Sequence, residues 1–238
     1  MPLSAARALS VLLALLAWTL PAHGASLSVA PTRVELGPAE RSAVVTLRND
    51  STETVMVQVQ TFAWPDGPAT AELVPTRDLI AVPPVFEIAG NGRQIIRVAL
   101  RSPLPGPREH AFRLLITEVP RGGAATTGVR FALRLSLPVF VIPDGARPEP
   151  QWSLRGRGSG QFDLVLRNVG DAHLQVRGIT WRPEGRPGPT TGIDTPAYVL
   201  AGREYSWPLP GGAVAGPIEL QAETSLGTLP ATVSPPRG

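Results

Sequence analysis

The segment Gly128–Gly145, which reads GVRFALRLSLPVFVIPDG, decides the fold class of this chain. Every second residue from position 129 to position 141 is apolar, namely Val129, Phe131, Leu133, Leu135, Leu137, Val139 and Val141. An alternation with a period of two indicates a β-strand, because successive side chains of a strand point to opposite faces of the sheet. A strand of about 5–6 residues presents about three side chains to a core. This run has more apolar side chains than one core face can cover, so we expect a strand that does more than fill a core.

Short strand-like segments recur on both sides of this run, with turn-forming residues between them. The chain contains 27 prolines and 24 glycines, which suit short strands and frequent turns rather than long helices. Gly90-Asn91-Gly92 is one such turn, between the apolar segments VFEI and RQIIRVAL. The sequence therefore predicts an all-β fold. Its roughly seven strands before residue 145 predict an immunoglobulin-like sandwich.

The proline-rich segment from Ile142 to Pro150 predicts a hinge between two domains. We expect a signal peptide at residues 1–24, an N-terminal immunoglobulin-like domain at residues 25–144 and a C-terminal immunoglobulin-like β-sandwich domain at residues 145–238. The strand pattern of the C-terminal domain is weaker. Its predicted core consists of Phe162, Leu164, Leu166, Leu174, Val176, Ile179, Leu200, Trp207 and Leu220.

The first residues have the pattern of a secretory signal peptide. Arg7 precedes an apolar stretch from Ala8 to Leu20, and the small-residue motif Ala22-His23-Gly24 follows it, with cleavage expected after Gly24. A membrane anchor is the alternative, but the apolar stretch is shorter than the roughly 20 residues that span a bilayer. We therefore expect an exported protein that is not inserted in a membrane.

Composition excludes several classes of function. The chain has no cysteine, which rules out thiol catalysis and cysteine-ligated metals. All 22 basic residues are arginines, they are scattered along the chain, and the formal net charge is only +3. A nucleic-acid-binding surface would require a basic cluster, so we expect no nucleic-acid partner.

No catalytic or metal-binding motif is visible. His110 and His173 each stand alone beside predicted loops, where a histidine is usually a solvated surface residue. The chain lacks a nucleophile elbow, a P-loop and a dinucleotide fingerprint. Its carboxylates are dispersed, without the pair that a glycosidase requires. We therefore expect a protein that is not an enzyme, with no catalytic residue, no metal site and no cofactor.

Three further stretches carry a family resemblance. SVAPTRVEL places Arg33 near the start of the mature chain, and PVFEIAGNGRQIIRV has an apolar strand, a glycine turn and a Gln-x-Ile-Arg sequence. AFRLLITEVP contains the most specific motif, formed by Phe112, Arg113, Glu118 and Pro120. In this order, these stretches resemble the periplasmic pilus chaperones of the chaperone–usher pathway, the PapD-like family. The resemblance extends to about residue 145, and the C-terminal part matches only in size and β character.

This resemblance implies an L-shaped pair of immunoglobulin-like domains and a chaperone that binds pilin or fimbrial subunits. Such a subunit lacks one strand, and the chaperone lends a strand of its own before an outer-membrane usher receives the subunit. The implied donors are Val129, Phe131, Leu133 and Leu135, whereas we expect the later side chains, from Leu137 or Val139 onward, to pack in the core or between the domains. A free chaperone could pair with a second copy through the same strand.

The resemblance also implies an anchor for the carboxylate at the end of the subunit chain. Arg33 occupies the place of the arginine that binds this carboxylate in the family. The usual second cation, a lysine of the last strand, falls at Pro138, and the chain has no lysine. Arg134 is our candidate for the second cation, with Arg97 and Arg113 as alternatives. These departures resemble archaic or spore-coat-like branches. Because proline lacks an N–H, we also expect Pro138 to interrupt the strand ladder.

Two other functions remain open from the residues alone. The first is an exported two-domain adhesin or ligand-binding protein, which would have aromatic clusters in its loops. The second is a hydrolase on a β scaffold, which would require a nucleophile and a base that converge in space. The loops of this chain are mostly proline, glycine and arginine, which favours the chaperone.

Overall fold

The computed structural model describes residues 27–64, 73–120, 132–185, 188–210 and 216–236. The predicted signal peptide and the donor positions Val129 and Phe131 lie outside these residues. Throughout the described part of the chain the regular elements are β-strands, and no helix occurs there. Accordingly, none of the described segments forms a helix that could cross a membrane. The prediction of an all-β fold is confirmed.

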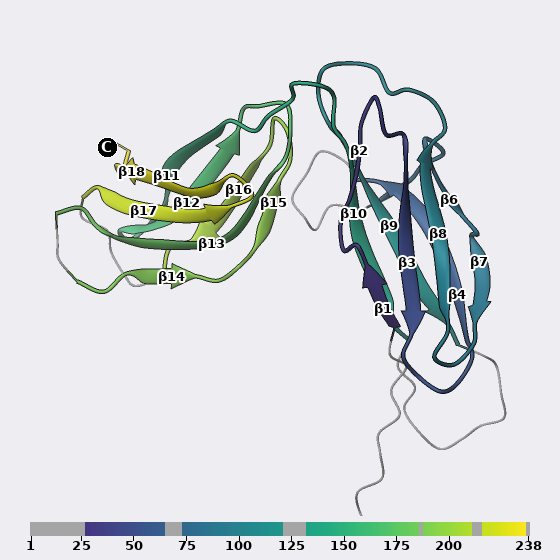
Figure 1. Cartoon of the computed structure of the whole chain (residues 1–238). Helices are drawn as coiled ribbons and strands as arrows, with labels where there is room; N and C mark the ends of the chain where they lie inside the picture. The colour runs from purple at the N-terminus through teal and green to yellow at the C-terminus, as the bar shows by residue number, and fades with distance from the viewer. Residues whose placement is uncertain (1–26, 65–72, 121–131, 186–187, 211–215, 237–238) are drawn as a thin grey trace, which may run out of the picture.

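The N-terminal unit is built from ten strands. They are β1 (Leu27–Ala30), β2 (Val34–Leu36), β3 (Ser42–Asn49), β4 (Val55–Ala63), β5 (Val74–Pro75), β6 (Leu79–Val82), β7 (Val85–Ile88), β8 (Arg93–Leu100), β9 (His110–Val119) and β10 (Arg134–Val141). A four-stranded sheet has the order β1-β3-β8-β6. It packs on a six-stranded sheet of order β2-β10-β9-β4-β5, in which β7 also pairs with β4; we call this second sheet the β10 sheet (Figure 1).

The alternation along β10 separates two environments. Leu137, Val139 and Val141 are buried in the core between the two sheets, as expected for the later side chains of the run. Leu133 and Leu135 are half-buried and pack against the rim of this core. Consecutive side chains of a strand point to opposite faces, so the face of the β10 sheet that is turned away from the core is a second surface.

β10 pairs with β9 along its whole length but with β2 only at one end. The antiparallel register with β9 runs without a break from Arg134 to Val141 and includes Pro138 opposite Arg113. The parallel register with β2 covers only Val139–Val141. The expectation that Pro138 interrupts the strand ladder is therefore wrong for the ladder with β9.

The direction of the backbone groups explains why this proline is tolerated. Ile142 N–H donates to the carbonyl of Leu36, the last residue of β2, at 2.8 Å, whereas the carbonyl of Leu133 accepts from Glu118 N–H of β9 at 2.9 Å. Because backbone groups alternate along a strand, the even-numbered residues of β10 direct their N–H groups toward the β2 edge. The N–H that Pro138 lacks belongs to that edge, where proline costs no bond to β9.

The C-terminal unit is a second sandwich of eight strands. They are β11 (Pro150–Gly158), β12 (Gln161–Asn168), β13 (Leu174–Pro183), β14 (Thr191–Ile193), β15 (Ala197–Val199), β16 (Glu204–Pro208), β17 (Ile218–Thr224) and β18 (Gly227–Val233). One sheet has the order β11-β12-β16. The other, which we call the β13 sheet, has the order β14-β13-β17-β18, with β15 also paired to β13.

Most of the predicted C-terminal core is found in place. Seven of the nine predicted residues are buried in this core, namely Leu164, Leu166, Leu174, Val176, Ile179, Trp207 and Leu220, and Phe162 packs against it. Leu200 is the error, because it is buried in a separate cluster with Trp64 and Phe140 of the N-terminal unit. Its apolar character showed that it is buried but not which unit covers it.

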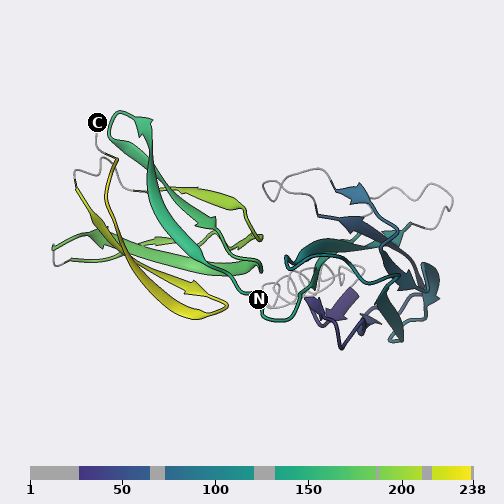
Figure 2. The ribbon, with the colours of Figure 1, turned by 90° about the horizontal axis from the view of Figure 1, so that it is seen from above.

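The two units meet beside the segment 142–149, which contains no strand and in which the predicted domain boundary falls. The sandwiches extend from this junction in different directions (Figures 1 and 2). The cluster of Trp64, Phe140 and Leu200 fills the contact, and Tyr198 packs against it. The junction is therefore an apolar contact between two separately cored units.

A Leu-Arg-Asn sequence ends one strand in each unit and closes its loops. Asn49 ends β3 and Asn168 ends β12, and both are completely buried. The Nδ2 of Asn49 donates to the carbonyls of Glu53, Ile88 and Ala89 at 2.6, 3.2 and 3.1 Å. The Nδ2 of Asn168 donates to those of Ala172, Val199 and Leu200 at 2.7, 3.1 and 3.3 Å. The side-chain amide of each asparagine thus ties the end of its strand to the backbone carbonyls of neighbouring segments of the same unit.

Asn49→Asp is expected to lower the free energy of unfolding by about 3 kcal/mol or more, because the oxygen that replaces the Nδ2 amide would be buried against three carbonyl oxygens. Denaturant unfolding of the mature chain measures this loss. Asn91→Asp is the matched control, since Asn91 is exposed in the predicted turn with a φ of 59° that aspartate also tolerates. Equal stability of the two variants would contradict the role of Asn49.

Candidate partner-binding surface

The outer face of the β10 sheet approaches the C-terminal unit at the junction. We call this part of the sheet, formed by Arg33, Arg113, Pro138 and Phe140, the junction face. Val34, the residue after Arg33, is aligned with Val139 of β10, and Pro138 of β10 is aligned with Arg113 of β9. The strands β2, β10 and β9 therefore carry the residues of this face side by side. The junction face is therefore one continuous surface that carries two arginines.

Arg33 lies immediately before β2 and bridges the two units. Its Nη1 donates a hydrogen bond to Gln175 Oε1 of β13 at 3.3 Å, and its Nη2 forms an ion pair with Glu35 at 2.9 Å. The side chain remains 35% exposed. A guanidinium has five N–H donors, so Arg33 retains donors for a carboxylate from a partner, which it could bind through two parallel bonds.

The three candidates for a second cation lie in different places. Arg134, at the exposed start of β10, is four residues from Pro138, or about 13 Å along the strand. Arg97 is exposed on β8 of the other sheet, where it pairs with Val44. Arg113 is on the strand next to β10, directly opposite Pro138. Arg33 directly precedes Val34, which is aligned with Val139, the residue after Pro138. Of the three candidates, Arg113 is therefore the one whose strand position is nearest to that of Arg33.

Arg113 is held by an aromatic ring. Its Cζ lies 3.5 Å from the centroid of the Trp64 ring, in the geometry of a cation–π contact. Burial lowers the pKa of the Arg113 guanidinium, and the nearby Tyr198 opposes this shift in part. Arg113 thus fixes Trp64 in the apolar cluster of the junction.

The free edge of β10 is the other feature of this surface. Among the described residues, no strand pairs with Arg134–Leu137 on the β2 side. Arg134 and Ser136 direct their N–H and C=O groups to this edge, and both residues are exposed. Such a row of unpaired backbone groups is a template for pairing with another chain. Leu133 and Leu135 accompany it as half-buried apolar side chains.

The motif residues mostly shape the hairpin of β9 and β10. Phe112 is buried in the N-terminal core, and Pro120 follows the end of β9. Glu118 bonds to Leu133 twice: its N–H donates to the Leu133 carbonyl at 2.9 Å, and its Oε2 accepts from Leu133 N–H at 3.3 Å. Glu118 therefore orients Leu133 beside the free edge.

The positions of two junction residues were not predicted from the sequence. His173, expected on the surface, is buried with 7% exposure and pairs with the buried Glu109. Its ring stacks on Phe140. Glu109 also lines a hollow of about 410 Å³, to which both units contribute residues, among them Trp64 and Leu200. No local sequence pattern predicts the pair, because its two members belong to different units.

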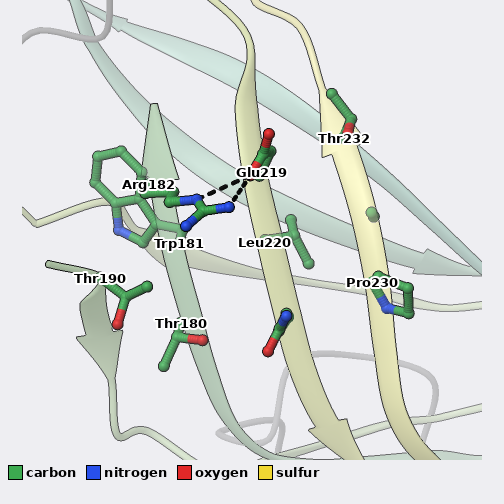
Figure 3. Close-up of a pocket in the computed structure, with 10 residues that line it drawn as sticks. Thr180, Trp181, Arg182, Thr190, Glu219, Leu220, Pro230 and Thr232 are labelled. Carbon is green, nitrogen blue, oxygen red and sulfur yellow. Dashed lines mark hydrogen bonds and ion pairs between the residues drawn. The ribbon is translucent and has the colours of Figure 1, made fainter. Parts of the chain in front are cut away.

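The β13 sheet has a depression of about 490 Å³ on its surface (Figure 3). Arg182 donates two hydrogen bonds to Glu219 there, at 2.8 and 2.7 Å, and this contact lowers the pKa of Glu219. Thr180, Thr190 and Thr232 supply further lining. Since the charges of Arg182 and Glu219 satisfy each other, this depression has no free charge that would bind a carboxylate.

No group of three or more metal-ligating side chains occurs within the described residues. The features that the structure brings together are instead a half-exposed arginine, a free strand edge and an apolar junction between two sandwiches. They define a two-domain immunoglobulin-like protein with an unpaired strand edge beside the junction of its two units.

Comparisons with known proteins identify the family. Residues 26–147 match the model of the pili and flagellar-assembly chaperones, PapD N-terminal domain. The chain belongs to this family, and the resemblance predicted from its motifs is confirmed. The chain is 27% identical over 197 residues to the chaperone protein FaeE of Escherichia coli. That alignment covers 82% of this chain but only 64% of the length of FaeE.

Solved structures of pilus chaperones share the fold. One is the pre-assembly complex of the chaperone CsuC and the tip adhesion subunit CsuE, from the archaic Csu pili of Acinetobacter baumannii. This match has a TM-score of 0.67 and 21% identity, and it covers 90% of this chain and 100% of that chain. Another is the SafA pilin with the SafB chaperone of Salmonella enterica, with a TM-score of 0.62, 19% identity and coverage of 87% and 95%. These matches confirm the predicted two-domain fold.

Proposed function

We propose that the protein is a periplasmic chaperone that binds pilus or fimbrial subunits by donor-strand complementation and delivers them to an outer-membrane usher. Membership of the pilus-chaperone family supports this function, as do the structural relatives described as complexes with a pilin or a tip adhesion subunit. The observation that carries the proposal is the free edge of β10 beside Arg33.

The free edge matches what an incomplete subunit lacks. A sandwich without its last strand exposes unpaired N–H and C=O groups and an apolar groove, and both are costly in water. Arg134 and Ser136 offer backbone groups to that edge, while Val129, Phe131, Leu133 and Leu135 supply apolar side chains with the spacing of alternate groove pockets. Chaperone–pilin complexes are themselves an established example of such strand addition.

Arg33 would hold the end of the subunit chain. A guanidinium that keeps free donors on a half-exposed face can bind a terminal carboxylate through two charge-assisted bonds. Arg134 lies about 13 Å further along the strand, so it would contact the subunit at a group other than that carboxylate. Arg33 would therefore set the register in which the subunit lies along β10.

Delivery would need no catalytic residue and no cofactor. The strand of the chaperone would leave the groove when a better-fitting strand from another subunit replaces it at the usher. In the absence of a subunit, the same free edge could pair with a second copy of the chain, since an unpaired edge promotes such association.

Ser136→Pro tests the strand addition. It removes an N–H that points to the free edge and leaves the bonds to β9 intact, as Pro138 already does two residues further along. The loss of one main-chain bond in the complex is expected to weaken subunit binding by about tenfold. Binding is measured by co-purification of subunits that are encoded beside the gene and co-expressed with the mature chain.

Ser136→Ala is the control for this variant, because it removes the hydroxyl but keeps the N–H. We expect it to bind subunits as well as the unaltered chain does. Equal recovery with Ser136→Pro and Ser136→Ala, both folded, would show that the free edge of β10 does not pair with the subunit.

A further inference from the structure

Gln175 and Arg177 of β13 lie beside the place where the C-terminal unit meets Arg33. Leu174 and Val176 are buried in the C-terminal core, so Gln175 between them points to the opposite face of the β13 sheet. On that face Gln175 Oε1 accepts a hydrogen bond from Arg33 Nη1 at 3.3 Å. Arg177 follows two residues later, about 7 Å along the strand, and its side chain is exposed. Arg177 is therefore a near neighbour of the contact that Arg33 makes across the units.

A β-bulge directs the side chain of Arg177 away from the core. Val176 is aligned with Thr224 of β17 and Gly178 with Glu223, so Arg177 is the extra residue of the bulge. Bulges bend a strand locally and change the direction of a side chain, often next to functional sites. Here the bulge keeps Val176 buried and leaves Arg177 exposed on the face that carries Gln175.

The guanidinium of Arg177 is folded back toward Gln175. Its Nη1 donates to the carbonyl of Thr224 at 3.4 Å. The next residue, Ser225, donates its N–H to the carbonyl of Gln175 at 2.9 Å. A hydrogen bond of 3.4 Å is longer than usual for an N–H donor and a carbonyl acceptor. Arg177 can therefore exchange this bond for a closer acceptor.

The charges around Arg33 favour a second cation. Arg33 already forms an ion pair with Glu35 at 2.9 Å. A carboxylate from a partner would bring a second negative charge to the same guanidinium, and two like charges at such a distance repel each other. Within the described part of the chain, no carboxylate forms an ion pair with Arg177. The charge of Arg177 is thus available to balance the incoming carboxylate.

The arginines of the N-terminal unit are less suited to this task. The Cζ of Arg113 lies 3.5 Å from the centroid of the Trp64 ring, so Arg113 would have to leave the apolar cluster of the junction. Arg134 is about 13 Å along the strand from Pro138. Arg177 would give up only one long hydrogen bond.

We propose that Arg177 is the second cation for the terminal carboxylate of a subunit, and that it binds this carboxylate together with Arg33. This role rests on the proposed chaperone function. It deepens that function, because the carboxylate would be bound from both units at once rather than by the N-terminal unit alone.

The test uses two synthetic peptides with the sequence of the final strand of the co-purified subunit. One ends in a free carboxylate and the other in a carboxamide, and their dissociation constants with the mature chain are measured by isothermal titration calorimetry. The unaltered chain should bind the carboxylate peptide about a hundredfold more tightly than the carboxamide peptide. Arg177→Ala should weaken binding of the carboxylate peptide by about tenfold or more and leave binding of the carboxamide peptide unchanged.

Arg182→Ala is the matched control. Arg182 belongs to the same strand and is also exposed, but its guanidinium already donates two hydrogen bonds to Glu219. Its removal should leave the binding of both peptides unchanged. Arg177→Lys keeps the positive charge and should retain most of the preference for the carboxylate. Because Arg177 is exposed, we expect Arg177→Ala to unfold at the same denaturant concentration as the unaltered chain.

The outcomes separate this inference from the chaperone function. If Arg177→Ala binds the carboxylate peptide as tightly as Arg182→Ala does, or if it weakens both peptides equally, Arg177 is not the second cation. If the unaltered chain binds both peptides equally or binds neither, no cation anchors the carboxylate and the inference is wrong as well. Recovery of a whole co-expressed subunit by the unaltered chain decides the chaperone function independently of the peptides.

Discussion

Arg33→Ala is expected to abolish the recovery of a co-expressed subunit while the chain stays folded. The substitution removes the guanidinium that would bind the terminal carboxylate through two charge-assisted bonds, a loss of ~4 kcal/mol or about a thousandfold in affinity. The contacts of Arg33 within the chain, with Glu35 and Gln175, are half-exposed, so their loss should cost less than about 1 kcal/mol of stability.

Two further variants make this result specific. Arg33→Lys keeps the charge but not the planar pair of donors, so an intermediate loss of roughly tenfold is expected. Arg48→Ala removes another arginine of the same unit, which forms an exposed ion pair with Asp50, and it should change nothing. Subunit yield is compared after co-purification, and folding is followed by thermal unfolding. A full yield from a folded Arg33→Ala variant would contradict the carboxylate anchor.

Leu133→Asp is the second substitution for which we expect a large effect. The side chain would enter the apolar groove of the subunit, where burial of a leucine contributes about 1.5–3 kcal/mol and a carboxylate is strongly disfavoured. We expect subunit binding to weaken by more than about a hundredfold. In the free chain Leu133 is only half-buried at the rim of the core, so the loss of stability should be much smaller than the loss of binding.

Ala132→Asp is the control for Leu133→Asp. Ala132 is the exposed neighbour of Leu133, and consecutive side chains of an extended segment point in opposite directions. The two variants introduce the same charge one residue apart, so only Leu133→Asp should reduce the amount of co-purified subunit. An equal reduction in both would indicate a general effect of charge rather than occupation of a groove.

The sequence predicted the features that depend on local periodicity. The alternation predicted a strand here, and the structure forms β10 over Arg134–Val141 and places Leu137, Val139 and Val141 in its core. Turn residues marked the loop at Gly90, and the glycine- and proline-rich composition excluded long helices. Such features can be predicted from the sequence because the geometry of a single strand imposes the period of its apolar residues.

Features that depend on strand register or on contacts between the units could not be predicted from the sequence. Pro138 was expected to break a ladder, but register alone decides that its missing N–H belongs to the β2 edge. His173 was expected on the surface, but Glu109, 64 residues away in the sequence, comes to it and buries it. Likewise, only the sheet order shows that Arg113 neighbours β10 and that Arg97 lies in the other sheet.

Amide hydrogen exchange tests the central claim, that a subunit pairs with the free edge of β10, most directly. In the free chain the amides of Leu135 and Leu137 should exchange slowly, because they face β9, whereas those of Arg134 and Ser136 should exchange rapidly. In the complex with a co-purified subunit, the amides of Arg134 and Ser136 should become protected as well. A stable complex in which both amides still exchange as rapidly as in the free chain would contradict the account.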